Sequence, residues 1–333
     1  MKKANIMVKG SYLLMAILMF TFFSCGNKQK EATPDVVNEE VEEVKEPFFK
    51  LSLAQWSLHN AIQEEGMSPY DFAQKASELG FEGIEYVSQL YTDELKKDAD
   101  PKVAMDMMLK ILKEKSETYN VTNVLIMVDE EGDLATLNEE EQAQTIENHK
   151  KWVDAAKFLG CHSIRVNAHG VGTAEEVAEA AVKGLTALST YAATQGINVL
   201  VENHGEYTSN GQWLAEVMAR VNMPNCGTLP DFGNFCMTEG YGSINSEECE
   251  DPYDIYKGVG ELMPYAKAVS AKSYDFDENG KQPKIDYTKM LQIVKDAGYK
   301  GFIGVEYEGE NLSEIDGINA TKKLLLDSAA KLK

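Results

Sequence analysis

The sequence predicts an α/β protein built as a single (β/α)8 barrel. From Phe48 onward, short apolar runs alternate with amphipathic segments of helical spacing, eight of each. Alternation this regular is typical of a parallel sheet, and eight strand–helix units are enough to close one into a barrel. The dinucleotide fingerprint GxGxxG and the phosphate-loop pattern GxxxxGK followed by Ser or Thr are both absent, which disfavours a nucleotide-binding doubly wound sheet.

The expected strands are short, rich in β-branched residues and bounded by glycine or polar residues, as buried strands are. Several begin after a glycine that ends the preceding helix and an aromatic residue that packs down, as in ELGFEGIE and DAGYKGFIGVE. In chain order the eight predicted strands are 51–56, 82–87, 121–127, 162–167, 197–202, 226–231, 267–272 and 301–306.

The expected helices carry an apolar stripe at helical spacing, and several have start signals. Ser68 precedes Pro69, Thr173 precedes two glutamates, and Asp286 opens the seventh segment. In chain order the eight predicted helices are 69–79, 101–118, 139–159, 173–195, 210–220, 252–263, 286–297 and 312–331. The insertion at 236–252 follows the sixth strand, so we expect it to form a lid or rim.

The amino terminus has the pattern of a bacterial lipoprotein signal. Three lysines precede an apolar stretch at 12–23, which is short for a membrane span, and Ser24 and Cys25 follow it. We therefore expect a signal peptide at 1–24 and a lipidated Cys25. The alternative is an ordinary signal peptide cut nearby, with Cys25 incidental.

Residues 25–47 then form a lipidated cysteine and an acidic linker, and residues 48–333 form the barrel. Function is expected outside the cytoplasm, in the periplasm or on the cell surface. The net charge of −22 disfavours nucleic acid and anionic lipid as partners, because both require clusters of Lys and Arg. Contact with a membrane is expected only through the lipid anchor.

Four carboxylates lie at or near the ends of apolar runs: Glu85, Glu202, Asp231 and Glu306. In a parallel barrel, the residues that end different strands meet at one mouth. Oxygen ligands suit Mg²⁺ or Mn²⁺, and an added imidazole favours Mn²⁺, Co²⁺ or Zn²⁺. We therefore expect a divalent metal centre at the carboxyl ends of the strands.

The order VEN, PDFGN, VSAKSYDF and GVEYEG over about residues 50–330 resembles the xylose isomerase-like TIM barrels, a superfamily of sugar isomerases and epimerases. The resemblance implies that Glu202 and Glu306 bind a divalent metal and act as acid and base, with Asp231 as a further ligand. Members of the superfamily often associate, so it also makes a homo-oligomer an expectation. Two positions depart from the pattern: Ser270 stands where a histidine ligand is usual, and Asn234 where some isomerases have another histidine.

Further residues are candidates for the site. His204 follows Glu202 by two residues, so we expect it on the same face, as a metal ligand or a substrate contact. Lys272 would be costly inside a barrel without a partner, so it either pairs with Asp231 or Glu306 or stabilises a substrate oxyanion as a catalytic group. The expected substrate-binding residues are His169, Glu85, Trp56, Asn234 and Tyr274. Arg165 is expected to form a buried ion pair outside the site.

Two cysteines, Cys236 and Cys249, bracket the insertion and could form a disulfide, although spacing alone does not fix the connectivity. Cys161 and Cys226 begin apolar strands and are expected to be core thiols. No Cys/His spacing typical of a zinc finger occurs.

The leading hypothesis is metal-assisted proton transfer next to a carbonyl on a sugar or keto-sugar, by an isomerase or epimerase. A lyase or hydratase acting on 3-keto-glycosides would use the same first step, and an extracytoplasmic location favours glycosides over phosphorylated sugars. A non-catalytic carbohydrate-binding lipoprotein is the third reading. The superfamily also includes endonucleases, which the net charge and the expected location disfavour.

Overall fold

The computed structural model describes residues 46–238 and 240–332, all within one compact unit that spans 44–333. The expected signal peptide, Cys25 and nearly all of the acidic linker lie outside the described residues. Within them, no helix is both long enough and apolar enough to cross a membrane.

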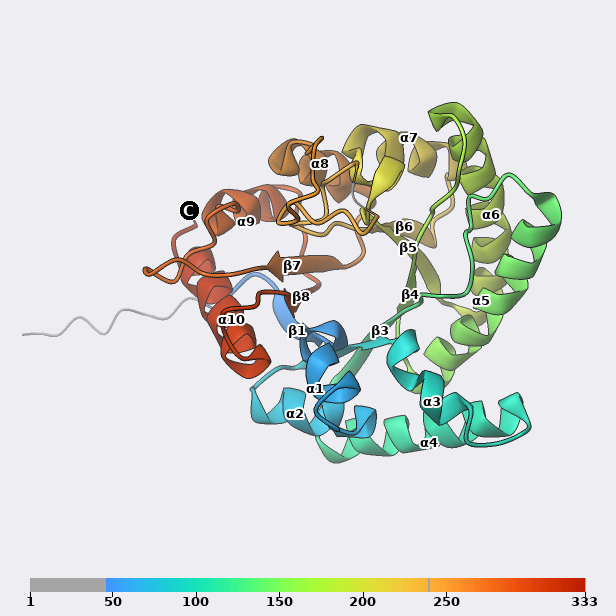
Figure 1. Ribbon diagram of the computed structural model, residues 1–333, viewed down its shortest axis with the longest axis horizontal. Helices are drawn as coiled ribbons and strands as arrows, with labels where there is room; N and C mark the ends of the chain where they lie inside the picture. The colour runs from blue at the N-terminus through green and yellow to red at the C-terminus, as the bar shows by residue number, and fades with distance from the viewer. Residues whose placement is uncertain (1–45, 239, 333) are drawn as a thin grey trace, which may run out of the picture. The chain divides into compact units, whose positions relative to one another are not determined.

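Eight strands form one parallel sheet with helices around its outside (Figure 1). The strand order is β6-β5-β4-β3-β2-β1-β8-β7, so β1 pairs with β8 and brings the first and last units together. This arrangement is that of an α/β TIM barrel, as the sequence predicts. The strands are β1 Lys50–Ala54, β2 Gly83–Val87, β3 Thr122–Met127, β4 Ser163–Val166, β5 Asn198–Glu202, β6 Cys226–Leu229, β7 Val269–Ser273 and β8 Phe302–Tyr307.

The contact between β6 and β7 is the sparse seam of the sheet. Single parallel bridges join Thr228 to Ala266 and Asp231 to Ser270. At the second bridge, the amide of Ser270 donates to the carbonyl of Pro230 at 3.0 Å, and the amide of Phe232 donates to the carbonyl of Ser270 at 3.1 Å. The seam therefore places Asp231 directly beside β7.

The helices start and end where local chemistry directs them. Thr173 forms a capping box with Glu176, and the side chain of Asp286 accepts from two backbone amides. Left-handed glycines, Gly160 and Gly196, end two long helices. The α-helices are α1 His59–Gln63, α2 Phe72–Glu78, α3 Thr92–Leu95, α4 Pro101–Thr118, α5 Glu139–Leu159, α6 Ala174–Gln195, α7 Gly211–Val221, α8 Ile255–Leu262, α9 Tyr287–Asp296 and α10 Glu314–Ala330.

Five short 3-10 helices complete the elements: η1 Gln55–Leu58, η2 Pro69–Asp71, η3 Ser88–Tyr91, η4 Glu206–Ser209 and η5 Met263–Tyr265. The predicted helix 69–79 is thus split into η2 and α2, because Pro69 opens it as a tight turn capped by the Ser68 hydroxyl. The predicted helix 252–263 begins at 255, where Asp254 caps it.

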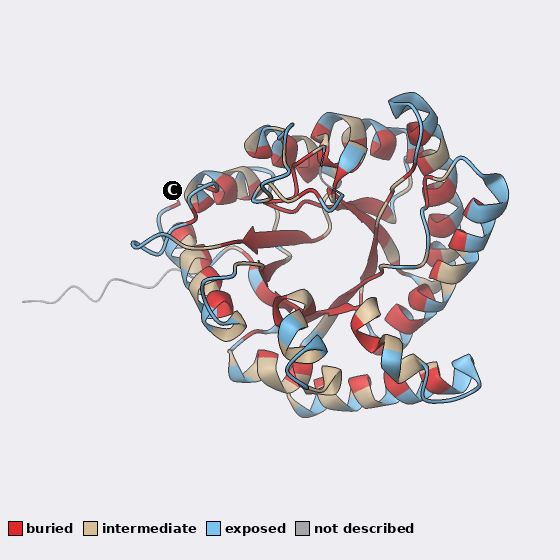
Figure 2. Ribbon diagram, viewed as in Figure 1, coloured by how far each residue is buried: buried red, intermediate tan, exposed pale blue. Residues whose placement is uncertain are grey.

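Apolar side chains form the floor of the mouth. Figure 2 shows the strands buried along most of their length. Leu200, Leu229 and Ala268 each lie two residues before a polar residue of the same strand or its extension, so they point to the same face one layer lower. They belong to an interior cluster separate from the larger core between sheet and helices. The barrel interior therefore changes from apolar to charged toward the carboxyl ends of the strands.

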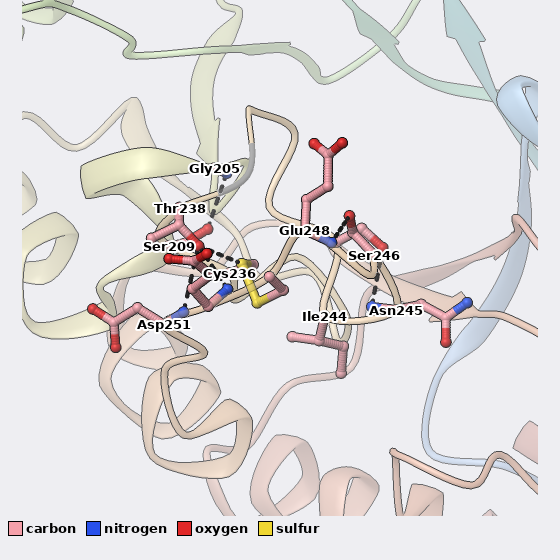
Figure 3. Close-up of a disulfide and its surroundings, with 12 residues drawn as sticks. Gly205, Ser209, Cys236, Thr238, Ile244, Asn245, Ser246, Glu248 and Asp251 are labelled. Atoms are coloured by element: carbon pink, nitrogen blue, oxygen red, sulfur yellow. Dashed lines mark hydrogen bonds between the residues drawn. A yellow bond between two sulfur atoms is a disulfide. The ribbon is translucent and has the colours of Figure 1, made fainter.

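A disulfide closes the insertion after β6. Cys236 and Cys249 are bonded, as the sequence analysis allowed, and Cys161 and Cys226 are buried free thiols, as expected (Figure 3). Antiparallel bridges join Asn234 to Ser243 and Cys236 to Pro252, so the segment folds back on itself as a compact loop.

Candidate metal centre

Three of the four carboxylates meet at the mouth of the barrel. Glu202 ends β5, Asp231 follows β6 and Glu306 lies near the end of β8. Each offers one oxygen within 4.8 Å of the other two. Their exposed fractions are 2%, 0% and 4%, so water screens their repulsion poorly.

The hydrogen bonds of this carboxylate triad (Glu202, Asp231 and Glu306) leave oxygens available for a cation. Asp231 Oδ1 accepts from the amides of Gly233 and Asn234, both at 2.8 Å, whereas its Oδ2 is buried without a hydrogen bond. Glu202 Oε2 has no aligned hydrogen-bond donor, although the Arg165 guanidinium lies 2.8 Å from it. Converging buried carboxylates, with the Asp231 Oδ2 oxygen left without a hydrogen bond, fit a hard divalent cation, so the residues present suit a metal.

Arg165 holds one side of the triad. Its Nε lies 2.8 Å from Glu202 Oε2, and its Nη1 lies 2.7 Å from Asp129 Oδ1, which also accepts from Asn167 at 2.8 Å. The expected buried ion pair is confirmed, but placing Arg165 outside the site was wrong. Its position inside an apolar strand, two residues before Asn167, was the available signal, and Asp129 was missed because it lies beyond β3.

Lys272 holds the other side. Its Nζ lies 3.2 Å from Glu306 Oε2 and donates to Glu308 Oε1 at 2.9 Å. The predicted pairing with Glu306 is confirmed. Glu308 was missed, although it follows Glu306 by two residues in GVEYEG and so continues the same face.

Ser270 occupies the position where the family usually has a histidine ligand. It adds no acid or imidazole to the triad and contacts Glu306. Its hydroxyl donates to Glu306 Oε2 at 2.9 Å. Oε2 of Glu306 therefore contacts both Ser270 and Lys272, and these two contacts fix the orientation of the carboxylate. The Asn234 side chain similarly donates to Glu202 Oε1, at 3.3 Å.

His204 does not join the triad, contrary to its expected role as a metal ligand: among the described residues, the group that could hold a metal consists of the three carboxylates. The reason is local. β5 ends at Glu202, and the chain then turns through Gly205 at a φ of 94°, so the strand pleat does not continue to residue 204. The backbone carbonyl of His204 contacts His169 Nε2 at 2.8 Å, and the two rings are stacked with centroids 6.2 Å apart.

Three residues expected to contact substrate differ in their burial and in their partners. Glu85 is the third residue of β2, not its end; it lies fully buried in the barrel and accepts from Ser52 at 2.6 Å. Tyr274 is also buried and donates to the carbonyl of Gly233 at 3.1 Å, so it cannot offer a face to a sugar. Trp56 remains partly exposed, stacked on His59 with ring centroids 4.5 Å apart and packed against the interior cluster.

Burial sets the protonation of the site. Burial raises the pKa of Asp231 to about 7, with Glu306 adding to the shift, and raises that of Glu202 well above its usual range. Burial alone would lower the pKa of Lys272, but Glu306 and Glu308 raise it well above its usual range. The His204 pKa is lowered well below its ordinary value by burial and by Arg165, so that ring is neutral.

The family can be stated from comparison with known proteins. The model of the xylose isomerase-like TIM barrel family matches residues 73–331. The chain belongs to this family. Two solved structures are similar in fold. The zinc-bound IolI protein has a TM-score of 0.61 and 18% sequence identity, and the alignment covers 86% of this chain and 99% of that protein. The 3-keto-D-glucoside 4-epimerase from E. coli has a TM-score of 0.62 and 12% sequence identity, and the alignment covers 83% of this chain and 98% of that protein.

Among curated proteins, a C-glycoside deglycosidase alpha subunit from Arthrobacter globiformis is 38% identical over 66 residues. The aligned segment is 19% of this chain and 19% of that protein. The chain thus matches about a fifth of the length of this relative. The family model, in contrast, matches most of this chain.

Replacing Arg165 by Met should lower the free energy of unfolding by about 3–5 kcal/mol, because Glu202 and Asp129 would lose their buried partner. Denaturant titration at neutral pH measures this. Adding Glu202→Gln to Arg165→Met should recover part of the loss. The matched control is Arg220→Met, which breaks an exposed pair with Glu175 and should cost no more than about 1 kcal/mol. Equal losses for the two arginines would contradict the role of Arg165.

The burial of Glu85 predicts a pH-dependent stability difference. Burial raises its pKa from 4.5 to about 7, opposed by the Ser52 hydrogen bond, so the folded state binds the proton more tightly than the unfolded state. Stability is therefore lost as pH rises through this window. Relative to the parent, Glu85→Gln should gain up to roughly 3 kcal/mol between about pH 4.5 and pH 8. Parallel stability–pH curves would show that Glu85 does not titrate there.

Proposed function

We propose that this protein transfers a proton next to a carbonyl group on a sugar or keto-sugar, as an isomerase or epimerase. The observation that carries the proposal is the pair Glu202 and Glu306, two buried glutamates from β5 and β8 that converge with Asp231. Two carboxyl groups at one mouth can remove a proton from a carbon and return one to a neighbouring atom or to the other face.

Each glutamate is oriented by separate groups. Arg165 and Asn234 contact the two oxygens of Glu202, while Ser270 and Lys272 share one oxygen of Glu306. Because both groups contact Oε2, the other oxygen, Oε1, is the one suited to face a substrate. Burial raises the pKa of Glu202 well above its usual range, which is the direction that suits a general acid.

A divalent cation held by Glu202, Asp231 and Glu306 would polarise the carbonyl oxygen and stabilise the negative charge of an enediolate. Mn, Mg, Co and Zn are the candidates from ligand chemistry, and because the triad consists of three carboxylates without an imidazole, Mg²⁺ or Mn²⁺ is favoured. Lys272, a buried ammonium between Glu306 and Glu308, adds a fixed positive charge beside the reacting atoms.

The second candidate is a lyase or hydratase that acts on 3-keto-glycosides. It would begin with the same proton removal, after which the electron pair expels a leaving group instead of accepting a proton. The short match to a C-glycoside deglycosidase alpha subunit favours it, and the 3-keto-D-glucoside 4-epimerase fold neighbour is compatible with either reaction. A carbohydrate-binding protein without catalysis is the third candidate, and it needs no convergent pair of glutamates.

The reaction should be visible as exchange of hydrogen with solvent. In D₂O, the protein loaded with Mn²⁺ or Mg²⁺ should incorporate deuterium next to the carbonyl of keto-sugars such as 3-keto-glucosides, detected by NMR. Glu306→Gln and Glu202→Gln should each slow this exchange at least 100-fold, because each removes a general acid or base. Glu310→Gln, an exposed acid on the same β8–α10 loop, is the control and should keep parental rates.

Metal content, measured by mass spectrometry, separates the candidates further. Near-stoichiometric metal in the parent that is lost in Asp231→Asn supports the centre. Keto-sugar binding that survives in Glu306→Gln, with no exchange in the parent or in any variant, would identify a carbohydrate-binding protein. Exchange followed by release of the aglycone would identify a lyase.

We also propose that Cys25 carries a lipid that anchors the protein outside the cytoplasm. The lysines, the apolar stretch 12–23 and the small residue Ser24 before Cys25 support this. Cells grown with a radiolabelled fatty acid should label the full chain but not its Cys25→Ser variant. Equal labelling of both, or labelling of neither, would contradict the anchor.

A further inference from the structure

One aromatic side chain stands exposed on the disulfide-closed loop. Tyr241 has 70% of its surface exposed, although tyrosines elsewhere in the barrel, such as Tyr274, are buried. Its ring lies against that of His204, with centroids 5.6 Å apart and planes inclined at 53°. The rings of His169 and His204 are nearly parallel, at 12°. These three rings, His169, His204 and Tyr241, form an aromatic row.

The backbone beside Tyr241 is held by the close contacts of Gly242. Gly242 has a φ of +82°, and a Cβ there would lie 2.5 Å from the amide nitrogen of Gly205. The carbonyl of Gly242 accepts from the amide of Cys236 at 2.7 Å, and Cys236 is bonded to Cys249. Figure 3 shows the disulfide beside Gly205 and Ser209 of the loop after β5. Residue 242 is thereby packed onto the segment that follows Glu202.

The aromatic row lies next to the carboxylate triad but nearer to solvent. His204 follows Glu202 by two residues, and Asn234, two residues before Cys236, donates to Glu202 Oε1 at 3.3 Å. Glu202 is 2% exposed, whereas Tyr241, whose ring lies against that of His204, is largely exposed. A substrate whose reacting carbon reaches Glu202 would therefore extend past Tyr241 on its way to solvent.

We propose that the aromatic row is a subsite for a flat apolar group attached to the sugar, namely an aromatic aglycone. The inference rests on the proposed function and narrows its substrate class to glycosides. The exposed phenol ring of Tyr241 presents a surface that packs on aromatic groups, whereas the triad and its partners are polar and charged. A free monosaccharide bound at the triad would leave the outer ring unused.

The test is a comparison of two probes by isothermal titration calorimetry on the metal-loaded protein, phenyl β-D-glucoside and methyl β-D-glucoside. The phenyl glucoside should bind about threefold to tenfold more tightly, the range expected for one aromatic pair. Tyr241→Ala should abolish this difference without changing the affinity for the methyl glucoside, and Tyr241→Phe should preserve it. The control is Phe158→Ala, an exposed ring near the end of α5, where the chain leads into the amino end of β4.

The outcomes separate this subsite from the proposed function. Equal affinities for the two probes in the parent, or an undiminished difference in Tyr241→Ala, would overturn the subsite while leaving proton transfer intact. Binding of neither probe, with deuterium exchange still observed on a free keto-sugar, would also overturn it. If neither probe binds and no deuterium exchange is observed, both the subsite and the proposed function on which it rests are contradicted.

Discussion

The mutual repulsion of three buried carboxylates is the constraint around which the mouth of this barrel is organised. Glu202, Asp231 and Glu306 converge within 4.8 Å in a region that water hardly reaches. Two buried cations compensate them from opposite sides, Arg165 from β4 and Lys272 from β7. Because an unpaired buried charge is strongly destabilising, each of these five side chains must be held in register with the others by its strand or by the segment that follows it.

The cations also explain how the site can differ from its relatives and still be assembled. Where the family usually has a histidine ligand, Ser270 donates a hydrogen bond to Glu306, and Lys272 contacts the same oxygen. The loss of one neutral ligand therefore leaves the acidic groups oriented. What changes is the ratio of acids to neutral donors, which moves the preference of the site toward cations that favour oxygen.

Much of the fold followed from the sequence, because strand periodicity, helix caps and glycine ends are local signals. All eight strands were predicted, and the triad followed from the rule that strand ends meet. The errors have a common cause: contacts between distant segments cannot be read from the local sequence. Glu85 was expected at the mouth, although the predicted strand 82–87 and β2 both continue past it to Val87, and the turn at Gly205 moved His204 off the pleat. Arg165 and Glu308 required knowledge of which strands face one another.

The sparse seam between β6 and β7 has a consequence for motion. Isolated bridges join these strands, whereas neighbouring strands elsewhere form ladders of several residues. Local opening of a protein begins where the fewest backbone hydrogen bonds must break, so amide hydrogens at this edge should exchange with solvent earlier than those of β4 and β5. Asp231 lies on that edge. The triad is thus built across an edge that only isolated bridges join, which would give a bound ion a route in or out without unfolding of the rest.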